Sequence, residues 1–206
     1  QGTHYTPDRR SFNRQTLMEL LFATNNRHKL REILEIAGDR HVIFSLADAG
    51  LVAEIPENAD TLEGNAIEKA RFVYERTGRN CFADDTGLEI DALNGRPGVY
   101  SARYAGEGCT FDDNVRKVLI EMEGVELRTA RFRCVICLIL NGEEYLFEGR
   151  VEGSILERPD GDGGFGYDPV FRPQGFSQSF ASMSPGEKNQ ISHRGRAMRA
   201  MMNFLG

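Results

Sequence analysis

The hydrophobic residues of the N-terminal part form short strand-like runs separated by stretches with helical periodicity. Residues 20–23 are an apolar run that predicts a buried strand, and the polar residues 24–26 break it. Apolar residues then recur at the i, i+3, i+4 and i+7 positions of one helix face, and these are Leu30, Ile33, Leu34 and Ala37. Gly38 ends this predicted helix, and residues 41–46 form a second predicted strand.

The central part of the chain adds two predicted helices with a strand between them. Asp60 and Glu63 have the spacing of a capping box, and the helix that they begin ends near Gly78. Residues 81–83 form a short predicted strand. A helix is expected over residues 110–122, with a capping threonine as its first residue.

The C-terminal part begins with a predicted β-hairpin. Residues 130–140 and 144–152 are rich in β-forming residues and flank Asn141 and Gly142, a typical hairpin turn. A glycine-dense loop follows over 159–168. The last predicted helix carries an apolar stripe that indicates core packing rather than a cofactor surface. This stripe consists of Met198, Met201, Met202 and Leu205.

This order of elements predicts an α/β fold. Helices alternate with strands before an antiparallel hairpin, so we expect a mixed, twisted β-sheet with flanking helices. We expect one domain of two lobes over residues 18–206, with the ligand in a central cleft. Residues 1–16 are polar, and Met18 directly precedes the first strand. We interpret residues 1–17 as a tag or a disordered, dispensable extension.

Composition and charge argue against some classes of function. The chain has 206 residues, 40% of them hydrophobic and 27% charged, as in soluble globular proteins. Its formal net charge of −6 argues against nucleic-acid binding, which depends on excess Lys and Arg. Apolar runs such as 135–140 are too short to span a bilayer, so we expect no membrane association. Positive groups that hold an anionic ligand must therefore be concentrated locally.

The cysteines favour a reducing compartment over a metal site. Cys134 and Cys137 form a CxxC pattern, which is typical of zinc binding or thiol exchange. Both lie in a predicted strand, where an offset of three places side chains on opposite faces. They cannot chelate one ion in this geometry, and buried free thiols are the better interpretation. We therefore predict a cytoplasmic protein.

The first candidate site follows the first strand. Backbone N–H groups at a helix start bind anions, and Asn and Lys side chains add donors and charge. The residues with this potential are Thr24, Asn25, Asn26, Arg27, His28 and Lys29. The structural alternative is that Thr24 or Asn25 only caps the helix and Lys29 is a solvated residue.

The second candidate is the acidic pair Asp84 and Asp85, which follows an apolar strand. Two adjacent carboxylates need a compensating cation, and with Glu57 they offer oxygen ligands suited to Mg²⁺. Neighbouring strand residues point in opposite directions, so we expect only one of the pair to reach the cleft. The alternative is a turn capped by one Asp.

Two C-terminal segments complete the candidate chemistry. In the glycine-dense loop, Phe165 and Tyr167 offer flat apolar faces for a base, although both could instead be core aromatics. Residues 187–194 are expected at the start of the last predicted helix. Of these, Lys188 and Arg194 are natural phosphate or carbonyl donors, whereas His193 could equally be structural. Together, the four segments predict a Mg²⁺–nucleotide site.

Short motifs in these segments occur in a fixed order. They are Phe22–Asn26 with Lys29, Gly64–Ala70, Ala83–Leu88, Pro97–Arg103, Gly164–Pro169, and Glu187–Asn189 with Ser192–Arg194. The set closely resembles the inosine triphosphate pyrophosphatase family over residues 19–206. The resemblance implies an elongated mixed sheet of two lobes in a homodimeric, Mg²⁺-dependent hydrolase. Such enzymes clear the non-standard purine nucleotides ITP, dITP and XTP by converting them to the monophosphate and pyrophosphate.

The resemblance also implies roles for individual residues. Asp85 would be the catalytic base and a metal ligand, Glu57 a further ligand, and Asp84 an assisting one. The triphosphate would be gripped by residues 24–29. The side chains expected to contact phosphate or sugar are Lys69, Thr86 and Lys188. The expected base pocket consists of Phe165, Gly166, Tyr167, Asp168, His193 and Arg194.

An arginine suits the bases of the nucleotides that this family hydrolyses, because its donor fork matches the 6-oxo group and N7 of hypoxanthine. Adenine presents a 6-amino donor there and would leave Arg194 unpaired. Two alternatives remain: a pyrophosphatase for modified pyrimidine nucleotides on a similar fold, and a nucleotide sensor without catalysis. The intact acidic pair argues against the sensor, since a sensor needs no general base.

Overall fold

The computed structural model describes residues 17–206. The prediction for residues 1–17 therefore concerns, apart from Leu17, residues outside the described part of the chain. The strands are β1 (Glu19–Phe22), β2 (Val42–Phe44), β3 (Cys81–Ile90), β4 (Pro97–Gly98), β5 (Thr129–Leu140), β6 (Glu143–Ile155) and β7 (Phe171–Pro173). The helices are α1 (Arg27–Ala37), α2 (Leu62–Thr77), α3 (Phe111–Glu121), α4 (Pro185–Ile191) and α5 (His193–Leu205). Short 3₁₀ helices cover Asp91–Leu93, Ser101–Arg103, Asp168–Val170 and Phe180–Ser182.

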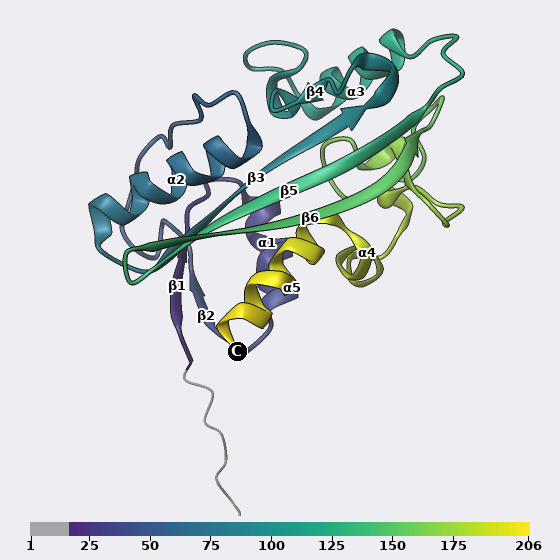
Figure 1. Ribbon diagram of the computed structural model, residues 1–206. Coiled ribbons are helices and arrows are strands. Elements are labelled where there is room, and N and C mark those ends of the chain that lie inside the picture. Colours follow the sequence, from purple (N-terminus) through teal and green to yellow (C-terminus); the bar gives the residue numbers. More distant parts are fainter. Residues whose placement is uncertain (1–16) are drawn as a thin grey trace, which may run out of the picture.

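The strands join one seven-stranded mixed sheet in the order β2-β1-β3-β5-β6-β7, with β4 beside β3 (Figure 1). β2, β1 and β3 run parallel, whereas β5, β6 and β7 continue the sheet antiparallel. The long β5–β6 hairpin turns at Asn141 and Gly142, whose φ angles of 53° and 88° suit a tight hairpin. The predicted mixed α/β sheet and its hairpin are confirmed.

Helices cover both faces of the sheet (Figure 1). α2 packs on one face with Val135 and Cys137, and α1 and α5 pack on the other with Cys134 and Ile136. Successive side chains of β5 point to opposite faces, so the two cysteines lie in different cores. Both thiols are free and buried, and burial raises the pKa of each to about 12. The expectation that this CxxC cannot bind one ion is confirmed.

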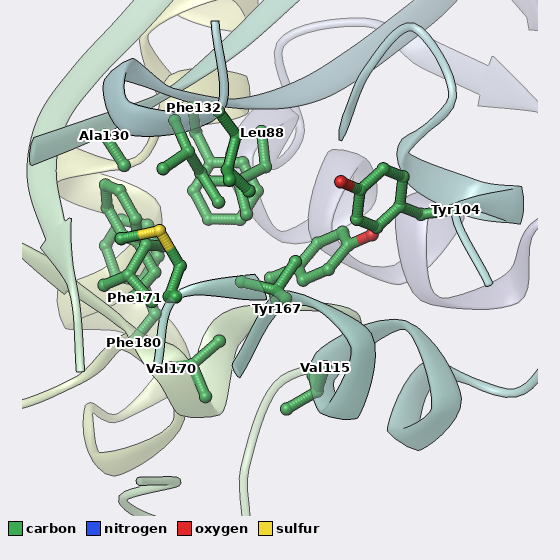
Figure 2. Packing of buried hydrophobic residues seen from close by; sticks show 14 of the residues in the cluster. Leu88, Tyr104, Val115, Ala130, Phe132, Tyr167, Val170, Phe171 and Phe180 are labelled. Atoms are coloured by element: carbon green, nitrogen blue, oxygen red, sulfur yellow. The ribbon is translucent and has the colours of Figure 1, made fainter. Parts of the chain in front are cut away.

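A third core at the far end of the sheet combines aliphatic side chains with several aromatic rings (Figure 2). Phe132 of β5 packs edge-on against Phe171 of β7, with ring centroids 4.7 Å apart. Tyr167 is buried in the same cluster, and its hydroxyl donates to the backbone oxygen of Ser101 at 2.8 Å. This core therefore fixes the glycine-dense loop that contains Tyr167.

The predicted helix boundaries are largely correct. α2 begins one residue later than expected, because Thr61 rather than Asp60 caps it and accepts from the backbone of Gly64. α2 ends as predicted at Gly78, whose left-handed φ of 63° suits glycine. Thr110 caps α3 through a complete capping box.

The prediction that β3 ends at residue 83 is wrong. β5 pairs with β3 from Cys81 to Ile90, so the ladder continues through Asp84 and Asp85. The two carboxylates therefore lie inside a long strand and not in a turn, which overturns the Asx-cap alternative. Strand pairing overrides their poor β propensity because both carboxylates meet cations in the folded protein.

The last predicted helix is divided in two. Ser192 separates α4 from α5 with an extended backbone (φ −65°, ψ 157°), and its hydroxyl accepts from the N–H of Gly195. The methionine stripe on α5 is buried in the core, as predicted. Within residues 17–206, no helix is long and apolar enough to cross a membrane.

Two glycines allow the α4–α5 junction to lie against the sheet. A Cβ atom on Gly149 of β6 would lie 1.9 Å from the backbone oxygen of His193, and one on Gly195 would lie 2.0 Å from that of Asn189. Any larger residue would force these segments apart. The close approach brings His193 and Arg194 directly onto the sheet.

Candidate active site

A cavity of about 370 Å³ collects most of the predicted site residues. Those that line it are Thr24, Asn25, Asn26, Lys29, Glu57, Lys69, Asp85, Thr86, Phe165, Gly166, Tyr167, Asp168, Lys188, His193 and Arg194. Sequence reasoning missed further lining residues, among them Glu54, Leu88, Val99, Ser101, Phe111 and Asn114. Leu88, Val99 and Ser101 lie within the motifs that carry the family resemblance, but no role had been assigned to them. Glu54, in a loop, and Phe111 and Asn114, on α3, lie outside those motifs.

Three predicted residues lie outside this lining. Arg27 is exposed on the first turn of α1. His28 is also exposed, and its ring stacks on Phe165 with centroids 5.1 Å apart. Asp84 is buried behind the cavity wall, so only Asp85 of the acidic pair lines the cavity, as expected from strand geometry.

The N-terminus of α1 forms one wall of the cavity. Asn26 caps this helix, and its Oδ1 accepts from the N–H groups of His28 at 2.9 Å and Lys29 at 3.2 Å. The structural alternative, in which Thr24 or Asn25 caps the helix, is wrong, because Asn26 is the cap and Thr24 Oγ1 accepts from the N–H of Asn26. The first turn contains no acidic residue, so the partial positive charge of the helix end remains available to an anion.

Asp85 is held by two donors from α2. Lys69 Nζ lies 3.0 Å from Asp85 Oδ1, and Asn65 Nδ2 donates to Asp85 Oδ2 at 3.1 Å. Lys69 Nζ also contacts Glu57 Oε1 at 2.6 Å, so one ammonium bridges both carboxylates. Burial works to lower the pKa of Lys69, but Asp85 and Glu57 outweigh it and raise that pKa.

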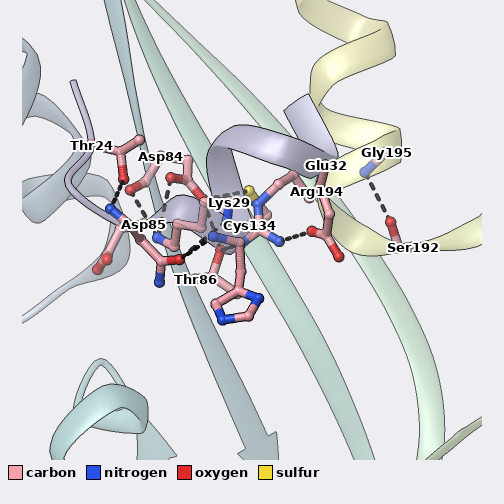
Figure 3. Close-up of polar contacts among 12 residues, drawn as sticks. Thr24, Lys29, Glu32, Asp84, Asp85, Thr86, Cys134, Ser192, Arg194 and Gly195 are labelled. Carbon is pink, nitrogen blue, oxygen red and sulfur yellow. Dashed lines mark hydrogen bonds and ion pairs between the residues drawn. The ribbon is translucent and has the colours of Figure 1, made fainter. Parts of the chain in front are cut away.

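Asp84 belongs to a buried ion network behind the cavity (Figure 3). Lys29 Nζ lies 3.1 Å from Asp84 Oδ1, and Arg194 Nε lies 3.1 Å from Asp84 Oδ2. Burial would raise the pKa of Asp84, but these two cations hold it well below its usual range. Asp84 is therefore ionised and acts as an internal counter-charge.

Glu32 joins the cations of the C-terminal helices and was missed by sequence reasoning. It pairs with Arg194 Nη1 and lies 2.6 Å from Lys188 Nζ. Arg194 Nη2 also donates to Thr86 Oγ1 at 3.1 Å. Burial would raise the pKa of Glu32, but Arg194 and Lys188 lower it. Nothing in the sequence distinguished Glu32 from the other polar residues of α1.

The glycine-dense loop closes around Asp168. Its carboxylate accepts from the N–H of Phe165 at 2.8 Å and pairs with Lys188 Nζ at 2.5 Å. Burial outweighs Lys188 and raises the pKa of Asp168. Gly164 has a φ of 69°, and a Cβ there would lie 2.1 Å from Asp168 Oδ2, so glycine is required. Tyr167 is a buried core aromatic that also lines the cavity, whereas Phe165 is half-buried.

His193 is buried and lines the cavity. Its ring stacks on Phe132 with centroids 4.6 Å apart. Its Nδ1 is buried and has no hydrogen-bond partner within the described part of the chain. Burial and the neighbouring Arg194 lower the pKa of His193 well below its usual value. The ring is therefore neutral.

The carboxylate oxygens at this site suit a hard cation that binds together with a phosphorylated ligand. Among residues 17–206, no three Asp, Glu, His or Cys side chains are grouped so as to hold a metal ion alone. Glu57 and Asp85 nevertheless converge on one cationic group. Mg²⁺ commonly takes one or two carboxylates and completes its shell with phosphates and water. These two residues therefore fit Mg²⁺ bound together with a phosphorylated ligand.

The fold and cavity define an α/β protein whose cleft combines a helix N-terminus, paired carboxylates and buried cations. The chain matches the model of the Ham1 family over residues 20–204 and belongs to that family. This result confirms the resemblance identified from the motifs.

Individual relatives agree with the family assignment. The chain is 53% identical over 188 residues to a dITP/XTP pyrophosphatase of Porphyromonas gingivalis, covering 91% of this chain and 97% of the relative. It is 49% identical to a protein of the same name from Flavobacterium psychrophilum, covering 91% of this chain and 99% of that one. A HAM1 protein structure from Coxiella burnetii superposes with a TM-score of 0.84 at 38% identity, covering 92% of this chain and 98% of the other.

Proposed function

We propose that this protein hydrolyses the non-standard purine nucleoside triphosphates ITP, dITP and XTP to the monophosphate and pyrophosphate. The observation that carries this proposal is the convergence of Asp85 and Glu57 on one cation, beside the N-terminus of α1. Relatives named dITP/XTP pyrophosphatase support the choice of substrate.

The charge balance of the cavity supports a requirement for Mg²⁺. The ion network contains four cations and five carboxylates: Lys29, Lys69, Lys188 and Arg194 against Glu32, Glu57, Asp84, Asp85 and Asp168. A bound triphosphate adds about four negative charges, which the network cannot neutralise alone. Mg²⁺ held by Asp85 and Glu57 would supply part of the missing positive charge and polarise the phosphate. Asp84 would assist by holding Lys29 and Arg194 in place.

Asp85 performs the proton transfer in the proposed reaction. Its carboxylate accepts a proton from the water that attacks the α-phosphorus, and pyrophosphate leaves. Lys69 and Asn65 orient the two carboxylate oxygens. Residues 24–29, which lead into α1 and form its first turn, hold the triphosphate. Thr86 and Lys188 contact phosphate or sugar.

The base occupies the end of the cavity near Phe165 and His193. Arg194 uses Nε, Nη1 and Nη2 for Asp84, Glu32 and Thr86. Each terminal nitrogen of a guanidinium carries a second N–H, so donors remain for a 6-oxo purine. A 6-amino group would leave these donors unpaired, which disfavours ATP.

The decisive experiment measures pyrophosphate release from ITP, dITP, XTP, GTP and ATP, with Mg²⁺ and with EDTA. We expect fast, metal-dependent release from ITP, dITP and XTP and slow release from ATP and GTP. Tight Mg²⁺–nucleotide binding without release would instead identify a sensor. Preference for modified pyrimidine triphosphates in the same assay would identify the other alternative.

We further propose a cytoplasmic homodimer that binds no nucleic acid, with residues 18–206 forming one domain of two lobes. The family resemblance supports the dimer, and the acidic net charge of −6 disfavours nucleic acid. Size-exclusion chromatography with light scattering tests the dimer, since a monomeric mass across micromolar concentrations would contradict it.

A further inference from the structure

The loop that contains Glu57 is held by side chains of α2. Residues 51–59 form neither helix nor strand, so no backbone ladder fixes this segment. Glu68 accepts two hydrogen bonds from Asn58, from its backbone N–H at 2.8 Å and from its Nδ2 at 3.0 Å. Asn65 Oδ1 accepts from the N–H of Ala59 at 2.9 Å. Two consecutive residues after Glu57 are therefore anchored to one helix.

The same helix also holds the other carboxylate of the site. Asn65 Nδ2 and Lys69 Nζ contact the two oxygens of Asp85. Asn65 and Lys69 are one helical turn apart and buried, and Ala66 and Ala70 of the same helix lie in the core. α2 thus contacts both Asp85 on the sheet and the loop that carries Glu57, and it fixes the position of one relative to the other.

Glu68 differs from Asn65 and Lys69, the other two residues of α2 that make these contacts. It is not among the residues that line the cavity, and it touches neither Asp85 nor Glu57 in the described structure. Its paired acceptors serve only the residue next to Glu57. A carboxylate that accepts two N–H bonds from one residue fixes both the position and the orientation of that residue.

We infer that Glu68 is a positioning residue that sets the affinity for Mg²⁺ by fixing Glu57 at the correct distance from Asp85. The inference rests on the proposed function, because it takes Glu57 and Asp85 as the Mg²⁺ ligands. Groups that orient metal ligands typically change metal affinity about 10–100-fold when removed. Without Glu68, Asn65 still anchors Ala59, so the loop stays folded but Glu57 samples more positions.

The test compares Glu68→Ala with Glu68→Gln, which keeps one acceptor oxygen, and with Glu75→Ala as a matched control. Glu75 is an exposed residue two turns further along α2. Mg²⁺ is titrated calorimetrically into the protein bound to α,β-methylene ITP, which cannot be cleaved between the α- and β-phosphates. We expect about tenfold weaker Mg²⁺ binding for Glu68→Ala, partial recovery for Glu68→Gln and no change for Glu75→Ala.

Two further readouts separate positioning from general destabilisation. Amide hydrogen exchange in the metal-free protein should speed up at Asn58 in Glu68→Ala and stay unchanged in the core of α2. The kcat for ITP should return close to that of the unaltered protein at saturating Mg²⁺, because Asp85 keeps both of its α2 donors.

Glu57→Gln distinguishes failure of the inference from failure of the proposed function. If Glu57→Gln weakens Mg²⁺ binding and Glu68→Ala does not, Glu68 is no positioning residue and the inference alone is overturned. If Glu57→Gln leaves Mg²⁺ binding unchanged, the proposed metal site fails and the inference fails with it. Equal loss of kcat at all Mg²⁺ concentrations in Glu68→Ala would also overturn the inference.

Discussion

Asp84 and Asp85 are neighbours in the chain but have different surroundings. Asp84 is surrounded by Lys29 and Arg194 behind the cavity wall, whereas Asp85 lines the cavity with Lys69. The alternation of side chains along β3 separates the two carboxylates. One is an internal counter-charge, and the other is available to a ligand.

This difference predicts the effect of Asp85→Asn. The amide keeps the shape of the side chain but cannot accept a proton, so kcat for ITP should fall about 10²–10⁴-fold. The melting temperature should change little, because Lys69 retains its contact with Glu57. Asp112→Asn, at an exposed position of α3, is the control. Near-normal turnover of Asp85→Asn would show that another group is the base.

Arg194→Ala should affect both stability and base preference. The change leaves Asp84 and Glu32 buried without this partner, which costs about 3–5 kcal/mol in the free energy of unfolding. The preference for ITP over ATP should also be lost. Urea denaturation and kcat/KM for both nucleotides measure these effects, with the exposed Arg196→Ala as control. Unchanged stability and unchanged discrimination would contradict both roles.

His193 predicts a pH dependence of stability. Burial lowers its pKa well below the ordinary value of 6.5, so the unfolded chain takes up a proton that the folded protein does not. Stability should therefore decrease as pH falls below about 6.5. His193→Phe should reduce this slope between about pH 7 and pH 5, measured by urea unfolding. An identical slope in the variant would assign the effect to other groups.

At the scale of elements, the close packing of α5 on β6 determines where His193 and Arg194 lie. Gly149→Ala would place a Cβ 1.9 Å from the backbone oxygen of His193. We expect a loss of about 1–3 kcal/mol in the free energy of unfolding and a raised KM for ITP. Gly186→Ala in α4 is the control, because a Cβ there meets no atom within 4 Å. Equal stability of the two variants would contradict this packing argument.

Elements with a strong local signal were predicted correctly from the sequence. The helical spacing of α1, the glycine that ends α2 and the Asn141 and Gly142 turn each depend on neighbouring residues only. The full length of β3 was not predictable in this way, because its second half is stabilised by pairing with β5 and by distant cations. The break at Ser192 was missed for a similar reason, since the close approach of α5 to Gly149 is a tertiary contact.

At the scale of the whole molecule, an acidic protein binds a polyanion through locally concentrated cations. The net charge is −6, and the cavity network itself has one more carboxylate than cations. Long-range attraction therefore gives little help, and nucleotide binding depends on the helix N-terminus and Mg²⁺.

Removal of Mg²⁺ should accordingly weaken nucleotide binding itself as well as turnover. Thermal melting with α,β-methylene ITP should show a clear rise in melting temperature with Mg²⁺ and a much smaller one with EDTA. Protein without nucleotide, melted in both buffers, is the control. An equal rise in EDTA would show that the protein neutralises the triphosphate without a metal.

The sequence by itself determined the α/β class, most helix and strand positions, and the motifs that identify the family. These features depend on local periodicity and on short runs of residues, which a linear chain displays directly. The tertiary structure alone decided how Lys29 and Arg194 surround Asp84, how Glu32 joins Lys188 and Arg194, and how Glu68 anchors the loop beside Glu57. Those outcomes depend on contacts between residues far apart in the chain, where burial strengthens each ion pair and requires that every buried charge find a partner.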